Sequence, residues 1–158
     1  MTRLFAAIAA SAFAVSTLAY ASSISWYVIP EDQGDCGDEC YTAPTAWIDD
    51  EANRHSFGIS CEDTMVIDGR AFYGVESEIE YLDMSVDGRS LGRFNVATGL
   101  NDIYVQNANG DPKAPKAVLA ALRAGQNLKL VLKNGQNIDF TLAGSRNALA
   151  LKDRLCTR

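Results

Sequence analysis

Residues 127–142 read NLKLVLKNGQNIDFTL, and this stretch decides the fold. Large apolar residues occupy every second position on both sides of Asn134-Gly135. This period of two is typical of strands with one buried face, and Asn-Gly is the strongest short signal for a two-residue hairpin turn. At about 1.5–3 kcal/mol for each fully buried side chain, the hairpin supplies a substantial part of a core. The side chains expected on its buried face are Leu128, Leu130, Leu132, Ile138, Phe140 and Leu142.

Two short helices are expected on either side of this hairpin. Pro115 suits the first turn of a helix and Gly125 suits its end, which predicts a helix at about 113–124. Ser145 is a good N-cap and predicts a second helix at about 145–155. The apolar stripe expected on the second helix consists of Ala148, Leu149, Leu151 and Leu155.

Short runs rich in β-branched and aromatic residues fill the chain before these helices, and such runs are typical of strands. Examples are residues 24–29 (ISWYVI) and 55–61 (HSFGISC). Asp68-Gly69 predicts a hairpin turn between strands at 64–67 and 71–75. Another strand is expected to bury Leu82, Met84 and Val86. Because turn signals recur at short spacing, we expect a mainly β fold, an antiparallel β-sandwich of short strands with two short helices.

The first 21 residues have the three parts of a secretory signal. Arg3 gives a positive start, residues 4–18 are apolar apart from small hydroxyl residues, and Ala19-Tyr20-Ala21 is a cleavage signal. A membrane anchor is the weaker alternative, because the apolar run is shorter than the roughly 20 residues that a span needs. We therefore expect residues 1–21 to be a cleaved signal peptide and residues 22–158 to form a single exported domain without a membrane span. The expected location is periplasmic or secreted, in a Gram-negative bacterium.

All four cysteines lie in the exported part: Cys36, Cys40, Cys61 and Cys156. An even number of cysteines in an oxidising compartment predicts disulfides. We favour the pairs Cys36–Cys40 and Cys61–Cys156, of which the second closes a long loop and contributes about 4–5 kcal/mol in the chain-entropy model. Pairing of Cys36 or Cys40 with Cys61 is the main alternative.

Residues 34–40 (GDCGDEC) raise the question of a reactive or metal-binding loop. The spacing C-x-x-x-C differs from the C-x-x-C of thioredoxin-like sites, and neighbouring carboxylates raise the pKa of a thiol. The acidic residues around the loop are oxygen ligands for Ca²⁺, but the alternating pattern of an EF-hand is missing. A structural disulfide is therefore favoured, with no metal and no cofactor. A thiol-disulfide or metal-binding protein that uses Cys36 and Cys40 is the alternative function.

His55 is the only histidine, and none of the common catalytic motifs occurs in the sequence. A zinc site based on histidine would need more nitrogen or sulfur ligands than one histidine provides. We therefore expect a protein that is not an enzyme.

Charge is distributed unevenly along the chain. Residues 22–88 contain 16 acidic residues against Arg54 and Arg70, whereas residues 89–158 contain 11 basic residues against four acidic ones. Either the halves neutralise each other across a solvated surface, or the first half forms an acidic face for a cationic protein partner, such as a basic cell-wall hydrolase like lysozyme. Nucleic acid is not an expected partner, since such a face repels it. The residues expected on the acidic face are Asp32, Asp35, Asp38, Glu39, Asp49, Asp50 and Glu51.

Residues 118–156 read VLAALRAGQNLKLVLKNGQNIDFTLAGSRNALALKDRLC. They contain a helix that ends in L-x-x-G, a hairpin, the motif F-x-L-x-G-S, a short helix and a closing cysteine. This order resembles the C-terminal block of the invasion-associated locus B family and of accessory periplasmic proteins of type VI secretion clusters. The resemblance covers about a quarter of the chain. It implies bacterial export, a β-sandwich and a non-enzymatic role, and it assigns no functional residue.

Overall fold

The structure is a computed structural model that describes residues 25–30, 32–33, 41–52, 54–69, 81–98 and 103–157. Its strands are β1 (Tyr27–Ile29), β2 (Asp32–Gln33), β3 (Tyr41–Thr42), β4 (Thr45–Asp49), β5 (His55–Ser60), β6 (Met65–Gly69), β7 (Tyr81–Val86), β8 (Arg89–Thr98), β9 (Ile103–Gln106), β10 (Asn127–Leu132) and β11 (Asn137–Thr141). Its helices are the 3₁₀ helix η2 (Cys61–Asp63), α1 (Lys116–Ala124) and α2 (Ser145–Cys156).

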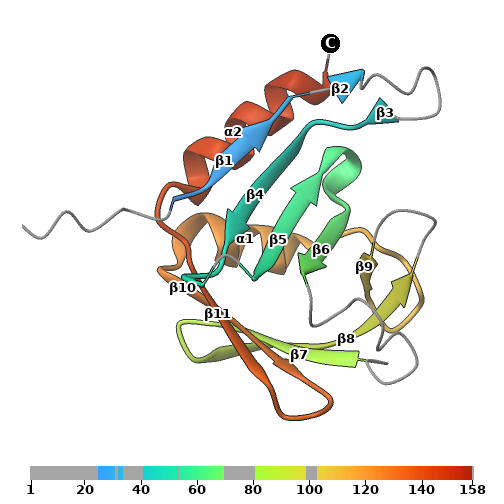
Figure 1. The fold of residues 1–158 in the computed structure, drawn as a ribbon, viewed down its shortest axis with the longest axis vertical. Coiled ribbons are helices and arrows are strands. Elements are labelled where there is room, and N and C mark those ends of the chain that lie inside the picture. Colours follow the sequence, from blue (N-terminus) through green and yellow to red (C-terminus); the bar gives the residue numbers. More distant parts are fainter. Residues whose placement is uncertain are drawn as a thin grey trace, which may run out of the picture.

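Nine of the strands form one antiparallel sheet in the order β1-β4-β5-β6-β9-β8-β7-β10-β11 (Figure 1). β2 and β3 pair with each other in a separate two-stranded ribbon. The expected mainly β, antiparallel fold with two helices is therefore confirmed. The expected sandwich needs two separate sheets, whereas the nine strands are joined by one continuous ladder of paired neighbours.

The large sheet curls until its two edges approach each other. The backbone N–H of Trp26, just before β1, donates to the carbonyl of Ala143, just after β11 (3.2 Å). The Trp26 indole N–H also donates to the carbonyl of Thr141 (3.2 Å). Inside the curl, the rings of Phe57 and Phe140 lie 6.3 Å apart between centroids, although β5 and β11 are far apart in the strand order. Sheets twist because of backbone chirality, and here the accumulated twist encloses one core.

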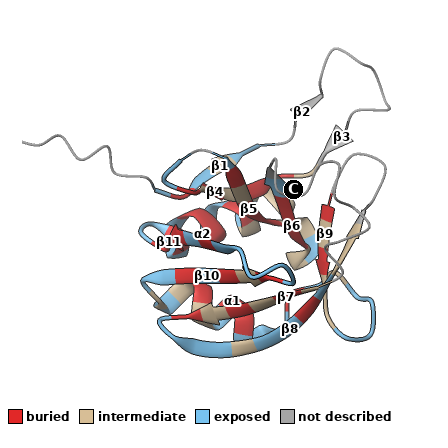
Figure 2. Ribbon diagram, turned by 60° about the horizontal axis from the view of Figure 1, so that its bottom comes forward, coloured by how far each residue is buried: buried red, intermediate tan, exposed pale blue. Residues whose placement is uncertain are grey.

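The hairpin of β10 and β11 contributes to this core as expected. Leu130 lies opposite Ile138 and Leu128 opposite Phe140, and all six side chains expected on the buried face are buried. The alternating pattern in β7 is also confirmed, since Leu82, Met84 and Val86 are buried. Figure 2 shows buried positions on the strands and on both helices, with exposed positions at the hairpin ends.

The first helix begins later than predicted, whereas the second begins at Ser145 as expected but has a different N-cap. Residues 113–115 are not helical, because Lys113 forms a β-bridge with Thr64 and the N–H of Ala114 donates to the carbonyl of Asp63 (2.9 Å). In α2 the N-cap is Gly144, in a left-handed conformation (φ 84°) that favours glycine. Ser145 is the first helical residue, and its hydroxyl donates to the carbonyl of Leu122 (2.6 Å), which joins the two helices.

Two further predictions are wrong in detail. Asp68 and Gly69 are not a turn, because they continue β6 and lie opposite Ser56 and His55 in β5; residues 71–75 lie outside the described residues. Leu151 is 40% exposed, whereas the next residue, Lys152, is 2% exposed. A period of 3.6 residues places Lys152 at the middle of the face formed by Ala148 and Leu149, and Leu151 at the edge of that face. None of the described helices is both long enough and apolar enough to cross a membrane.

Candidate functional site

An open cleft of about 660 Å³ lies between the turn that joins β4 to β5 and the strand β11. Side chains from both sides of the curled sheet meet there, because β11 contacts β4 across the curl. Carboxylates dominate the charged lining, and Arg54 is the one lysine or arginine among the described lining residues. The charged or ionisable lining residues are Asp49, Asp50, Glu51, Arg54, His55 and Asp139.

Asp50 anchors the turn at the base of this cleft. One carboxylate oxygen accepts the backbone N–H groups of Arg54 (2.7 Å) and His55 (3.4 Å). The other lies 2.7 Å from Nδ1 of His55, and both side chains are buried. Burial by itself raises the pKa of Asp50, but the hydrogen bonds from the His55 ring and from the two N–H groups outweigh it, so the pKa is lowered. Asp50 is therefore a buried, hydrogen-bonded carboxylate and does not belong to the exposed acidic face that the sequence predicts.

Asp49 points from β4 toward the neighbouring strands and is half-buried. Its Oδ1 atom accepts hydrogen bonds from the Ser56 hydroxyl (2.6 Å) and from the Tyr27 hydroxyl (3.2 Å). Partial burial of the Tyr27 ring and the nearby Asp49 charge and hydrogen bond, with a smaller contribution from Asp68, raise the pKa of Tyr27 to about 12. Both hydroxyl donors to Asp49 are neutral, so they hold the carboxylate in place without cancelling its charge.

The other two carboxylates form the rim of the cleft. Glu51 is exposed. Asp139 on β11 has a side chain that is 69% exposed, and its nearest described cation is Lys129 at 3.9 Å. Exposed ion pairs of this kind contribute little. The cleft therefore combines two fixed inner carboxylates with two solvent-accessible outer ones.

The remaining residues of the predicted acidic face are not brought into this cleft by any described contact. Asp32 lies in β2, and its side chain is not described. Asp35, Asp38 and Glu39 lie outside the described residues, as do Cys36 and Cys40. The acidic loop and its thiol chemistry therefore stay predictions.

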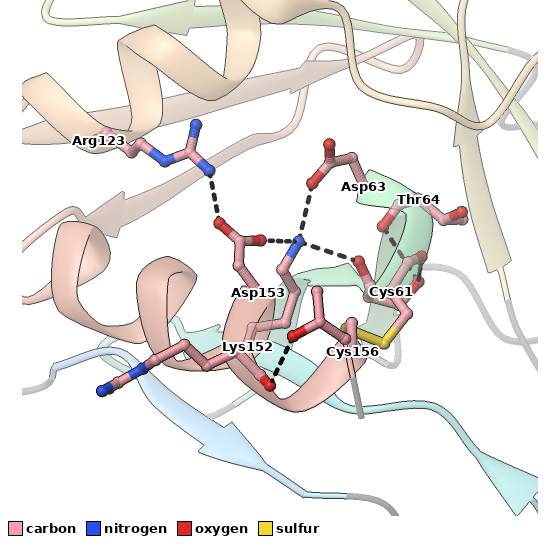
Figure 3. Close-up of polar contacts among 10 residues, drawn as sticks. Cys61, Asp63, Thr64, Arg123, Lys152, Asp153 and Cys156 are labelled. Carbon is pink, nitrogen blue, oxygen red and sulfur yellow. Dashed lines mark hydrogen bonds and ion pairs between the residues drawn. A yellow bond between two sulfur atoms is a disulfide. The ribbon is translucent and has the colours of Figure 1, made fainter.

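A second polar cluster surrounds the C-terminal end of α2 (Figure 3). A disulfide joins Cys61 to Cys156, the long-range pair that the sequence favours, with 5.6 Å between the Cα atoms. Beside it, the ammonium group of Lys152 donates to Asp63 and Asp153 (2.8 Å each) and to the carbonyl of Ser60 (3.4 Å). We call Lys152, Asp63, Asp153 and Arg123 the lysine cluster, since Arg123 also donates to Asp153 (3.1 Å).

The lysine cluster fixes a strained turn. Glu62 and Asp63 have φ angles of 63° and 61°, in the left-handed region that residues other than glycine seldom adopt. Lys152 and the disulfide hold this turn against α2, while Arg123 adds α1 through Asp153. Each charge in the cluster faces an opposite charge, which is the arrangement expected of a structural fastening.

Two of these features, the pair of Asp50 with His55 and the burial of Lys152, were not predicted from the sequence. The first could have been, because Asp50 lies only five residues before the single histidine, across an expected turn. The burial of Lys152 follows from helical period alone, but its partner Asp63 is 89 residues away in the chain.

The described residues contain no group of three or more histidine, cysteine or acidic side chains arranged to hold a metal ion. The cleft therefore offers fixed negative charge and hydrogen-bond acceptors as its chemistry. No family model, curated protein or solved structure matches the chain.

Proposed function

We propose that this protein is an exported, non-enzymatic binding or accessory protein whose acidic cleft receives a cationic group of a protein partner. One observation carries the proposal: the cleft of about 660 Å³ is lined by Asp49, Asp50, Glu51 and Asp139. A cationic side chain that enters a concave acidic site is attracted more strongly than on a flat surface, because the surrounding protein excludes water. Export and a periplasmic or secreted location rest on the N-terminal sequence, and the accessory role is consistent with the C-terminal resemblance.

The inner and the outer carboxylates of the cleft support binding in different ways. Asp49 is held by hydrogen bonds from neutral hydroxyls and needs no rearrangement to present its charge, while the buried Asp50 fixes the turn that carries Glu51. Glu51 and Asp139 lie at the rim, where charges mainly accelerate encounter and set specificity. A basic cell-wall hydrolase is the class of partner that we favour, and lysozyme is a defined probe of that class.

The test measures the dissociation constant for lysozyme at several salt concentrations. The Glu51→Gln/Asp139→Asn variant removes the rim charges without touching the buried pair of Asp50 and His55. We expect about tenfold weaker binding at low salt, and a smaller difference at high salt, because screening shortens the range of the field.

The control variant Asp83→Asn/Asp111→Asn changes the net charge by the same amount outside the cleft. It should bind like the wild type to within about twofold, since distant exposed charges are largely screened. Equal affinities for all three proteins at every salt concentration, or no binding of lysozyme and of basic proteins from a periplasmic extract, would reject the proposed function.

A further inference from the structure

A second hollow lies between the edge strand β1 and the helix α2. This groove has a volume of about 400 Å³. One wall is residues 25–28, and the other is a stripe of α2 formed by Asn147, Ala148, Leu151 and Arg154. Leu151 is three or four residues away from each of the other three positions, so all four share one face.

The two walls run side by side in the same direction (Figure 1). The hydrogen bond from Trp26 N–H to the carbonyl of Ala143 fixes the start of α2 beside the start of β1. From position 144 to 154 a helix rises about 15 Å, and the four extended residues from 25 to 28 span about 10 Å between their first and last Cα atoms. The groove is therefore long enough for about four residues of an extended peptide.

The strand wall offers an open backbone edge. β1 is an edge strand of the sheet, and its one strand partner among the described residues is β4. Amide directions alternate along a strand. Since the N–H of Trp26 points away from β4, toward Ala143, the N–H and C=O of Val28 face the same open side.

The side chains around the groove are apolar at the middle and cationic at one end. Tyr27 and Leu151, which line the groove, and Ile29, the last residue of β1, are each 40–42% exposed, and they are the exposed large apolar residues of the described chain. All three belong to β1 or α2, and natural proteins seldom leave apolar side chains beside an open strand edge without a partner. Arg154 is exposed, forms no ion pair with a described residue, and shares the groove with no described carboxylate.

We propose that this groove binds an extended, apolar peptide segment of a partner protein and adds it as a strand beside β1. An apolar side chain of the segment packs against Leu151, and an acidic side chain that follows it pairs with Arg154. Strand addition gives affinity through main-chain hydrogen bonds, and the pockets give specificity. Tyr27 lines the groove and also donates a hydrogen bond to Asp49 in the acidic cleft, but the groove selects an apolar and acidic segment rather than a cation, so this proposal does not rest on the proposed function.

The probe is a synthetic heptapeptide of alternating threonine and valine that ends in aspartate, acetylated and amidated at its termini. Its binding is followed by amide chemical shifts of the isotope-labelled protein. We expect the largest shifts in residues 25–29 and along α2. The Arg154→Gln variant should bind about two- to fivefold more weakly, the range for one exposed charge pair.

Two controls separate this effect from a general loss of charge or fold. Arg146→Gln, on the same helix but outside the groove, should bind like the wild type. A peptide with asparagine in place of aspartate should bind the wild type as weakly as the aspartate peptide binds Arg154→Gln, with no further loss in that variant. Leu151→Ser, which removes the apolar contact at an exposed position, should also weaken binding while the melting temperature stays within a few degrees of the wild type.

Several outcomes would overturn the proposal. Shifts that map to another surface or equal affinity of Arg154→Gln and wild type would do so, and so would unchanged binding of a peptide with N-methylated central amides. A much tighter complex with a free terminal carboxylate would assign the groove to chain ends instead. Concentration-dependent dimers of the protein alone that are lost in Leu151→Ser would assign it to a second copy.

Discussion

Carboxylates have opposite roles in the lysine cluster and in the acidic cleft. In the lysine cluster, Asp63 and Asp153 face the buried ammonium group of Lys152. In the cleft, Asp49 is held by the neutral hydroxyls of Ser56 and Tyr27. Charged donors cancel a carboxylate and fasten structure, whereas neutral donors orient it and leave its charge for a partner. Stability should therefore depend on the first region, and affinity for a cationic partner on the second.

The largest expected effect concerns the disulfide beside the lysine cluster. Replacing both residues, in the Cys61→Ala/Cys156→Ala variant, opens a loop with a sequence separation of 95. The chain-entropy model gives a loss of about 4–5 kcal/mol in the free energy of unfolding, measurable by urea denaturation. Under conditions where the variant stays folded, its affinity for lysozyme should equal that of the wild type. A loss below about 1 kcal/mol would show that the cluster does not need this fastening.

The second effect is the removal of the buried cation. Lys152→Ala deletes both ion pairs and the packed stem of a side chain that is 2% exposed, and we expect a loss of about 3 kcal/mol. Lys152→Met keeps the stem and should lose less, because Asp63 and Asp153 have side chains that are 31% and 46% exposed and can be rehydrated. The matched control Lys129→Ala breaks a surface pair of 3.9 Å and should change stability by less than about 0.5 kcal/mol. Equal losses for Lys152→Ala and Lys129→Ala would remove the distinction between the two regions.

Features that depend on residues close together in the sequence could be predicted, whereas features that depend on distant residues could not. The hairpin around Asn134-Gly135 was predictable because its period and turn are local signals. The curl of the sheet was not, since it depends on contacts such as that of Trp26 with Thr141, 115 residues apart. Asp50 was expected at the surface because a cluster of acidic residues is usually solvated. Its burial follows from the turn that brings His55 and two backbone N–H groups to its carboxylate.

The third effect tests Asp50 through its dependence on pH. The pKa of Asp50 in the folded protein is lowered from its ordinary value of 3.8. A carboxyl with a lowered pKa stabilises the fold above its unfolded pKa, and this contribution disappears as the pH falls through the folded value. Asp50→Asn should therefore be less stable than the wild type at pH 7, by about 2 kcal/mol for a lost charged hydrogen-bond acceptor.

The difference between these two proteins should shrink as the pH falls below about 4. Urea denaturation at a series of pH values measures it. Asp83→Asn serves as control, because Asp83 has a side chain that is 47% exposed and a pKa that is also lowered, by its hydrogen bonds with Arg93. A stability difference for Asp50→Asn that stays constant from pH 7 to pH 2.5 would contradict the assignment of Asp50 as an ionised anchor.

The smallest effect concerns the neutral donor that orients Asp49. Tyr27→Phe removes one hydrogen bond of 3.2 Å at a residue that is 41% exposed, so the expected loss of stability at pH 7 is about 0.5 kcal/mol.

The pKa of Tyr27 is raised from 10.0 to about 12. A raised tyrosine pKa means that the stabilisation is fully present below pH 10 and is lost as the pH rises toward 12. Ultraviolet titration of the folded proteins should show one tyrosine fewer titrating near pH 12 in the variant. If Asp49 also keeps its charge but loses its orientation, lysozyme should bind about twofold more weakly; a full loss of binding would mean that Tyr27 contacts the partner itself.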